Sequence, residues 1–116
     1  MVLQPHVESV QHVVLIELDD SASAPAMIQD MDNAFAQIPQ IRRWDAGPHI
    51  DTGRPVVLHW YTIGLTTEFA SVDDYRAYLA HPAHQALVAK WKPHWKRSEM
   101  FDFGSSAPSM AERTRM

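Results

Sequence analysis

The sequence predicts an α+β fold of the ferredoxin-like type, in which strands and helices follow the order βαββαβ and four strands form one antiparallel sheet. Three observations lead to this prediction. The chain has 116 residues, the usual size of one domain. Apolar residues recur with a period of two in some segments and with a helical period in others. No repeat or linker interrupts this pattern, so we expect one domain at residues 9–104, an N-terminal tail at 1–8 and a flexible C-terminal tail at 105–116.

The first strand is expected at residues 9–19, where apolar side chains alternate. One face carries Val10, His12, Val14, Ile16 and Leu18, and the other carries Gln11, Val13, Leu15 and Glu17. Both faces are largely apolar, which indicates that at least one of them is fully buried. The first helix is expected at residues 24–37, where apolar residues recur at helical spacing until Pro39 ends the helix.

The middle of the chain contains two further strand candidates. Residues 41–44 form the weaker one, and the Gly and Pro residues that follow, up to Pro55, indicate a loop. Residues 56–69 form the stronger one, because this stretch is rich in β-branched and aromatic side chains. We expect one face of it to carry Val57, His59, Tyr61, Ile63, Leu65 and Phe69.

The last third of the chain is expected to hold two helices and a short strand. Ser71 is a typical N-cap, and Asp73 and Asp74 follow it in the first helical turn. Pro82 suits the first position of a further helix. One stripe of that helix carries His84, Leu87, Val88, Trp91 and Trp95. Residues 98–103 then complete the sheet.

The composition excludes several classes of protein. The chain has no cysteine, so disulfides, thiol nucleophiles and thiolate metal sites are ruled out. Lys and Arg total 10 against 14 Asp and Glu, a net charge of -4, and we therefore expect no nucleic-acid partner. No apolar run approaches the roughly 20 residues that span a bilayer, and the first residues lack the order of a signal peptide. We predict a cytoplasmic protein that does not enter membranes.

Residues 90–97, KWKPHWKR, interleave basic and aromatic side chains. This composition suits single-stranded nucleic acid or acidic small molecules. The alternative is structural, because cations favour the end of a helix while Trp91 and Trp95 continue its apolar stripe. We favour the structural interpretation.

The segment at residues 75–84, YRAYLAHPAH, carries the candidate chemistry. Tyr78, His81 and His84 follow one another at intervals of three residues. If the helix continues through Pro82, the three side chains lie on adjacent turns and converge. If the helix breaks at His81, that ring lies at the start of the next helix, and His84 faces the sheet one turn further on. We favour the second geometry.

Rings from two strands are expected to face the same space between helices and sheet. His12 lies on the first strand, and His59 and Tyr61 lie on the third. Histidine suits general base catalysis, and a tyrosine hydroxyl beside it can orient a carbonyl or stabilise an enolate. Such a pocket, with Leu87 and Trp91 on its helical side, favours removal of a proton next to a carbonyl. The alternative is that the rings are hydrogen-bonded core side chains without chemistry.

A metal site is a further alternative. His81 and His84 together with His12 or His59 could bind zinc or copper, because imidazole alone is a ligand for both metals. No acidic residue lies within the motif, so we expect no bound metal. Imidazole and phenol are then the candidate catalytic groups.

Five short motifs occur together in this chain. They are His12-Val13-Val14-Leu15, Pro39 at the helix exit, Phe69-Ala70-Ser71, Tyr78-Leu79-Ala80-His81-Pro82-Ala83-His84 and Phe101-Asp102-Phe103. With them the sequence resembles the stress-responsive A/B barrel domain family over roughly residues 9–104, and the YxxHPxH run is the most specific part. The resemblance implies a homodimer in which two four-stranded sheets close into a dimeric α/β barrel. The sheet face that the helices leave uncovered would form the contact.

Some plant members of this family are polyketide cyclases, which close a linear polyketone by intramolecular aldol chemistry without a cofactor. The resemblance implies that His84 and Tyr78 correspond to their catalytic His and Tyr, and that His12 corresponds to a strand histidine. A further pocket histidine of those enzymes has no counterpart, because Ile63 stands at the aligned position. His59 lies on the same expected strand face.

We therefore predict a protein that binds a small carbonyl or aromatic compound in an apolar pocket and carries out cofactor-free cyclase or isomerase chemistry. The catalytic residues would be His84, Tyr78 and His12, and the ligand would contact His81, His59, Tyr61, Leu87 and Trp91. Two alternatives stay open. One is a non-enzymatic stress or oligomerisation protein, and the other is a monooxygenase of the dimeric barrel superfamily that uses haem or no cofactor.

Overall fold

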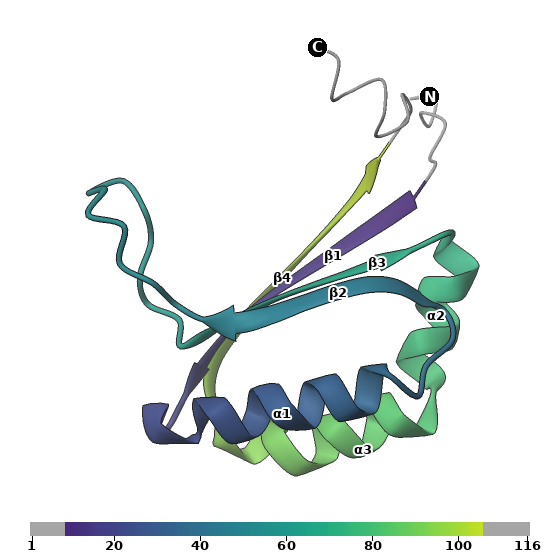
Figure 1. Cartoon of the computed structure of the whole chain (residues 1–116), viewed down its shortest axis with the longest axis horizontal. Coiled ribbons are helices and arrows are strands. Elements are labelled where there is room, and N and C mark those ends of the chain that lie inside the picture. The colour runs from purple at the N-terminus through teal and green to yellow at the C-terminus, as the bar shows by residue number, and fades with distance from the viewer. Residues whose placement is uncertain (1–8, 106–116) are drawn as a thin grey trace.

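The computed structural model describes residues 9–105, which form four strands and three α-helices in the expected order (Figure 1). Their bounds are β1 Ser9–Leu18, α1 Ala24–Phe35, β2 Ile41–Pro48, β3 Ile63–Phe69, α2 Val72–Ala80, α3 Pro82–Trp91 and β4 Trp95–Ser105. Short 3-10 turns at Ser21–Ser23 and Lys92–His94 precede α1 and β4. The tails predicted at 1–8 and 106–116 lie outside the described residues, whereas Ser105, expected to begin the C-terminal tail, is the last residue of β4.

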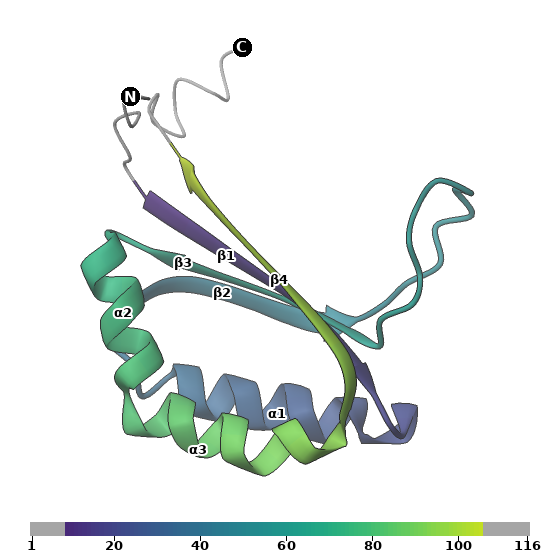
Figure 2. The ribbon, with the colours of Figure 1, turned by 180° about the vertical axis from the view of Figure 1, so that it is seen from behind.

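The sheet has the strand order β2-β3-β1-β4, and every neighbouring pair is antiparallel. Figures 1 and 2 show α1 and α3 side by side below one face of the curved sheet. Helix α2 lies at one end, where it connects the sheet to α3. The predicted ferredoxin-like βαββαβ fold is therefore confirmed. In this register His12 on β1 lies opposite Thr67 on β3 and Asp102 on β4.

The core lies between the sheet and the helices because side chains alternate along β1. His12, Val14 and Ile16 are buried, and the residues between them are only partly covered. Met27 and Met31 on α1, one helical turn apart, are also fully buried and pack against these strand residues. Residues from two different periodicities thus meet in one core, as the sequence pattern predicts.

A polar contact joins the two long helices at the surface. The Asp30 carboxylate on α1 accepts hydrogen bonds from the Lys90 ammonium at 2.6 Å and from the Trp91 indole N–H at 2.9 Å. These donors hold the pKa of the Asp30 carboxyl below its usual value. Lys90, the first lysine of the basic and aromatic segment at residues 90–97, therefore contributes to helix packing, in line with the structural interpretation of that segment.

The strand expected at residues 56–69 is half as long as predicted, and this corrects the sequence interpretation. Only Ile63–Phe69 is a strand. Residues 49–62 form a loop that projects beyond the end of the sheet (Figure 1). Pro48 pairs with Ile63, so β2 ends where β3 begins, and β1 ends two residues after Ile16, the partner of Ile63. Residues 56–60 therefore have no neighbouring strand. High β-propensity without a partner for its backbone groups does not make a strand.

The bounds of β2 and β4 also differ from the prediction, because strand pairing determines how far each strand extends. β2 continues to Pro48, four residues past the expected end, because β3 supplies a partner along that length. β4 spans Trp95–Ser105 instead of residues 98–103, since it pairs with the whole of β1. Trp95 therefore belongs to a strand, and the helical stripe ends at Trp91.

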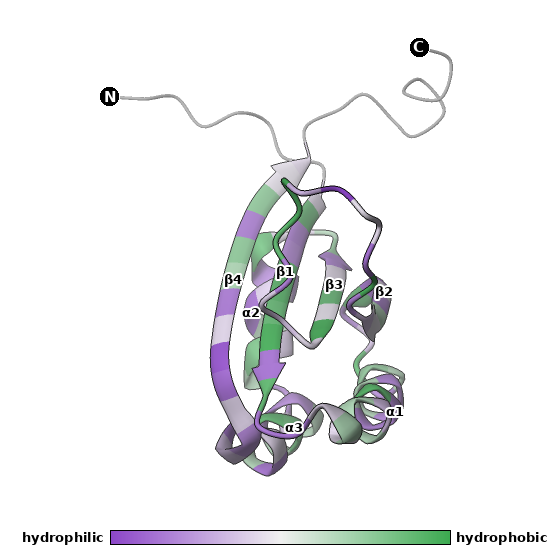
Figure 3. Ribbon diagram, turned by 90° about the vertical axis from the view of Figure 1, so that its left-hand side faces the viewer, coloured by the Kyte–Doolittle hydropathy of each residue, from purple (hydrophilic) through white to green (hydrophobic). Residues whose placement is uncertain are grey.

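None of the helices between residues 9 and 105 covers the second face of the sheet. Val13 pairs with Phe101 and Gln11 with Phe103, so these side chains share the uncovered face. Phe101 is 51% exposed and Phe103 is 57% exposed. Figure 3 shows the hydrophobic residues that follow one another along β1. Within residues 9–105 no helix is both long and apolar enough to cross a membrane.

Candidate functional site

A cavity of about 110 Å³ lies between the sheet and the helices. Residues from β1, β3 and β4 line one side, and residues from α1, α2 and α3 line the other. Most of its walls are apolar side chains such as Met27, Phe35 and Leu65. Four polar rings complete the lining, namely His12, Tyr75, Tyr78 and His84. A small apolar space with a few converging polar groups is the usual form of a ligand site.

His12 is held at the cavity by a carboxylate on the neighbouring strand. Its ring is only 4% exposed, and Nδ1 lies 2.5 Å from Asp102 Oδ1. The Tyr75 hydroxyl on α2 lies 3.1 Å from Asp102 Oδ2 and 3.2 Å from His12 Nδ1. The register explains the first contact, because His12 and Asp102 are directly opposite each other on β1 and β4. The second contact connects α2 with the edge strand.

Tyr78 is surrounded by aromatic rings. It is 2% exposed, and its ring centroid lies 4.9 Å from that of Phe69, 5.9 Å from that of Phe35 and 4.3 Å from that of His84. Burial raises the pKa of the Tyr78 hydroxyl, and the nearby Tyr75 adds to this effect. The phenol therefore keeps its proton at neutral pH. Its hydroxyl has no hydrogen-bond partner within residues 9–105, so it is free to donate to a ligand.

His84 lies at the first turn of α3 and faces the cavity. Its Nδ1 is 3.3 Å from the Leu79 carbonyl oxygen, which can only accept, so Nδ1 carries the proton. Burial lowers the pKa of His84 and the nearby His12 lowers it further, although the Leu79 contact acts in the opposite direction. The imidazole is therefore neutral at pH 7, with an unprotonated Nε2. A neutral imidazole beside a phenol can accept a proton from one atom of a ligand while the phenol donates to another.

His81 has a structural position. The helix breaks there, with His81 in an extended conformation between α2 and α3, which is the geometry we favoured from the sequence. Its Nδ1 accepts a hydrogen bond from the Ala83 backbone N–H at 3.0 Å, so the imidazole caps α3. His81 does not line the cavity. The break turns α3 so that His84 reaches the space beside Tyr78.

The other residues expected at the ligand divide into two groups. Leu87 lines the cavity as predicted, whereas Trp91 is buried outside it and donates to Asp30. His59 and Tyr61 lie in the loop at 49–62, because the strand that would have aimed them at His12 does not form. The expectation that these two side chains share the pocket with His84 is wrong. The metal set of His81, His84 and His12 or His59 is not brought together either.

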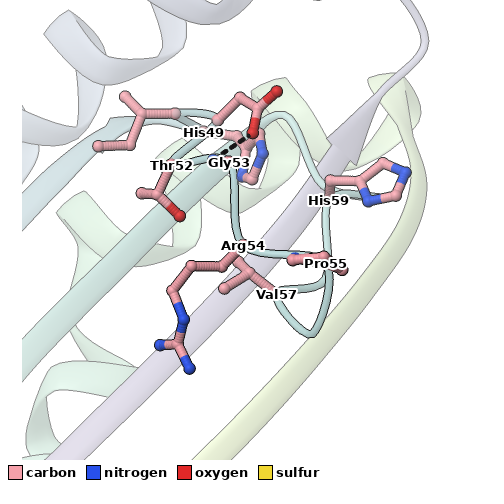
Figure 4. Close-up of a pocket in the computed structure, with 9 residues that line it drawn as sticks. His49, Thr52, Gly53, Arg54, Pro55, Val57 and His59 are labelled. Atoms are coloured by element: carbon pink, nitrogen blue, oxygen red, sulfur yellow. Dashed lines mark hydrogen bonds between the residues drawn. The ribbon is translucent and has the colours of Figure 1, made fainter.

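The loop has its own hollow of about 500 Å³, lined by residues 49–55 with Val57 and His59. Figure 4 shows that the Arg54 and His59 side chains point in different directions. Asp51 accepts a hydrogen bond from the Gly53 backbone N–H at 2.8 Å, which closes a tight turn where Gly53 has φ +78°. The polar groups of this hollow do not converge on one point.

Tyr75 and Asp102 belong to the cavity or its supporting network, and the sequence interpretation did not assign them a role in the site. Trp95, which the sequence places on the helical stripe, also lines the cavity. A signal for Tyr75 was present, since it precedes Tyr78 by one helical turn and so lies on the same face. Asp102 stands between two phenylalanines of an expected strand, and such a carboxylate needs a partner if it faces the core side. Only the strand register shows that this partner is His12.

A four-stranded antiparallel sheet with its helices on one face and a ring-lined cavity beneath it places the chain among the ferredoxin-like α+β proteins. The family described as Stress responsive A/B Barrel Domain matches residues 10–105, and the chain belongs to this family. The resemblance stated from the sequence motifs is thereby confirmed.

Similar proteins include one sequence relative and several solved structures. An uncharacterised protein of Streptomyces coelicolor is 31% identical over an alignment of 88 residues, and the match covers 72% of this chain and 87% of the relative. A dimeric ferredoxin-like protein of unknown function from Thermobifida fusca is 20% identical, with TM-score 0.72 and coverage of 90% of this chain and 97% of that one.

Two further solved structures come from enzymes. A hydroxynitrile lyase from Passiflora edulis is 16% identical with TM-score 0.76, and 88% of this chain and 97% of the lyase are covered. SnoaB, a cofactor-independent oxygenase from Streptomyces nogalater, is 15% identical with TM-score 0.67, covering 89% of this chain and 97% of the oxygenase. At such low identity these two likenesses show a shared fold.

Proposed function

We propose that this protein binds a small carbonyl or aromatic compound in the cavity. Without a cofactor, it removes a proton from the carbon next to the carbonyl group and later returns it. One observation carries the proposal. A neutral imidazole, His84, and a protonated phenol, Tyr78, lie with ring centroids 4.3 Å apart at the wall of a mainly apolar cavity. The first has a free acceptor nitrogen, and the second has a free donor hydroxyl.

The two groups have complementary roles. The Tyr78 hydroxyl donates a hydrogen bond to the carbonyl oxygen, which takes up negative charge as an enolate forms. His84 Nε2 removes the proton from the adjacent carbon and becomes an imidazolium. That imidazolium then returns the proton, either to another carbon in an isomerisation or to the new alkoxide oxygen in an intramolecular aldol closure. Each proton removed is delivered again, so no oxidant or cofactor is needed.

The size of the cavity limits the ligand. A volume of about 110 Å³ is comparable with the engineered cavity of about 150 Å³ that binds benzene. A compound of this size, carrying one carbonyl for an isomerisation or two for an aldol closure, would place its apolar part against lining residues such as Leu65 and Leu87. The cavity therefore favours a short ketone, aldehyde or aromatic carbonyl compound over a long polyketone.

We also infer that two copies associate through the uncovered face of the sheet. Val13, Leu15, Phe101 and Phe103 expose apolar surface there, and a solved relative of the same fold is dimeric. Light scattering at micromolar concentration is expected to give twice the chain mass. Leu15→Lys, which places a charge in the centre of this face, is expected to give single chains, and a wild-type protein that is monomeric would contradict the inference.

The test of function is proton exchange at the carbon beside a carbonyl. Small ketones and aromatic ketones are incubated in deuterated buffer with the protein, and deuterium incorporation is followed by NMR. We expect incorporation above the buffer rate for short compounds, and rates that fall as the chain outgrows the cavity. Absence of both binding and exchange across the series would favour the non-enzymatic alternative. Oxygen consumption with an aromatic substrate would favour the monooxygenase alternative instead.

A further inference from the structure

The hydrogen bonds around Asp102 determine which atoms carry protons. An ionised carboxylate only accepts hydrogen bonds, so both of its close neighbours must donate. His12 Nδ1 lies 2.5 Å from Oδ1, and the Tyr75 hydroxyl lies 3.1 Å from Oδ2. His12 therefore carries a proton on Nδ1. In the neutral imidazole, Nε2 on the opposite side of the ring is then unprotonated.

Tyr75 is able to donate at every physiological pH. Burial raises the pKa of its hydroxyl to about 12, and the contact with Asp102 contributes to this. Its single proton is donated to Asp102. The hydroxyl oxygen, 3.2 Å from His12 Nδ1, can then accept from the Nδ1–H of that ring, which also donates to Asp102. All three side chains fit one arrangement of protons. A second arrangement, with the proton on Nε2, would leave the Nδ1 lone pair facing the carboxylate.

Asp102 needs the contact with Tyr75 in order to stay in place. Its side chain is 48% exposed and lies on β4, one of the two edge strands of the sheet, where water competes for both oxygens. His12 holds one oxygen, and Tyr75, anchored by its ring 5.2 Å from Phe69, holds the other. The ring of Tyr75 is also 5.0 Å from that of His12. The phenol thus fixes both partners of the pair at once.

We propose that Tyr75 is a positioning residue that, through Asp102, holds His12 in the tautomer with its proton on Nδ1. His12 Nε2 is then a second hydrogen-bond acceptor for a ligand in the cavity. This acceptor selects compounds that carry a hydroxyl group beside the carbonyl. The inference rests on the proposed function for the identity of the ligand. The tautomer itself is a property of the resting protein. A hydroxy ketone would donate its hydroxyl to His12 Nε2 and accept from Tyr78 at its carbonyl.

The first experiment measures the tautomer without any ligand. Long-range proton-nitrogen NMR on protein labelled with nitrogen-15 distinguishes the two neutral forms of His12. We expect one form, protonated on Nδ1, in the wild type. In Tyr75→Phe, which keeps the ring and removes only the hydroxyl, we expect solvent exchange of the Nδ1 proton to become roughly tenfold faster. In Asp102→Asn we expect a mixture of both forms.

Matched controls separate positioning from a general effect on the fold. Tyr61→Phe removes a phenol hydroxyl in the loop and is expected to leave the His12 spectrum unchanged. A wild-type His12 protonated on Nε2 would overturn the proposal. An unchanged exchange rate in Tyr75→Phe, with the native spectrum otherwise preserved, would overturn it as well.

The second experiment compares two ligands of equal size, hydroxyacetone and butan-2-one, in which a hydroxyl replaces a methyl. NMR titration of the wild type is expected to show roughly fivefold tighter binding of hydroxyacetone, the value of one neutral hydrogen bond. Tyr75→Phe should reduce this preference toward one, because the affinity for hydroxyacetone falls more than the affinity for butan-2-one. A preference that persists in Tyr75→Phe, or tighter binding of butan-2-one by the wild type, would overturn the selectivity. Binding and tautomer as proposed, but without proton exchange, would refute the proposed catalysis alone.

Discussion

The hollow at the loop and the cavity beneath the sheet both contain histidines, and they differ in almost every other respect. The hollow at the loop is the larger, about 500 Å³ against about 110 Å³ for the cavity beneath the sheet. In the loop, His49 contacts Tyr61 edge-on at 4.8 Å, and its buried Nδ1 has no partner within residues 9–105. Beneath the sheet, His12 and His84 each have a hydrogen-bond partner at Nδ1.

The difference shows that volume alone does not make a reactive site. The cavity under the sheet is walled by regular elements, and each polar ring in it is oriented by a carboxylate, a carbonyl or a neighbouring ring. The loop hollow opens to solvent between exposed side chains, with Ile50 70% exposed. Pre-oriented groups in a space of low polarity are what acid and base catalysis requires. The smaller hollow meets this requirement.

The largest expected effect tests which hollow carries the chemistry. The double variant His84→Ala/Tyr78→Phe removes the proposed base and donor together. We expect the rate of deuterium incorporation into a bound ketone to fall by about 10² to 10⁴, the usual contribution of positioned acid–base groups. The matched variant His49→Ala/His59→Ala in the loop should stay within about twofold of wild type. A loop variant that loses activity while the cavity variant keeps it would reverse the comparison.

The second effect concerns stability. Phe35 is fully buried, packs on Tyr78 and lines the cavity, so Phe35→Ala is expected to lower the free energy of unfolding by about 3–5 kcal/mol. Val56→Ala in the loop should change it by less than about 0.5 kcal/mol. Urea unfolding followed by tryptophan fluorescence measures both. Equal losses in the two variants would show that the loop is as tightly packed as the cavity wall.

The smallest effect is a dependence of stability on pH. The pKa of His84 is lower in the folded protein than its usual value of 6.5. Below that value the unfolded chain binds more protons than the folded one, so stability rises with pH there and is lost as the pH falls. The groups around His84 are His12, Tyr78 and the Leu79 carbonyl, and the raised pKa of the Tyr78 hydroxyl keeps that group protonated throughout this range.

The measurement for this effect is the free energy of unfolding between pH 5 and pH 8. His84→Gln is expected to flatten the profile on its acid side relative to wild type. His59→Gln, at an exposed position in the loop, should keep the wild-type profile. If both variants kept the wild-type profile, His84 would not be linked to folding in this way.

Much of the fold and part of the site could be predicted from local sequence. The alternation along β1 placed His12 on the buried face, and Pro82 after His81 predicted the helix break that directs His84 inward. The motif placed Tyr78 beside His84. Each of these features depends on residues within a few positions of one another, where backbone geometry alone determines which side chains share a face.

The site residues that were missed, and those that were placed wrongly, depend on distant partners. His12 meets Tyr75 and Asp102 across 63 and 90 residues of chain. His59 and Tyr61 lie outside the pocket because β2 ends at Pro48 and β1 ends at Leu18, so their segment does not continue β3 as a strand. Nothing in residues 56–62 themselves indicates that absence.

The sequence by itself determined the order of the elements, the face on which His12 lies and the break at His81, because these follow from periodicity and from the backbone limits of proline. The tertiary structure decided where β3 begins, which histidines share the cavity, and that Asp102 and Tyr75 orient His12. Strand pairing and hydrogen bonds between distant residues set these features, since a strand or a buried polar group is stable only when another part of the chain supplies its partner.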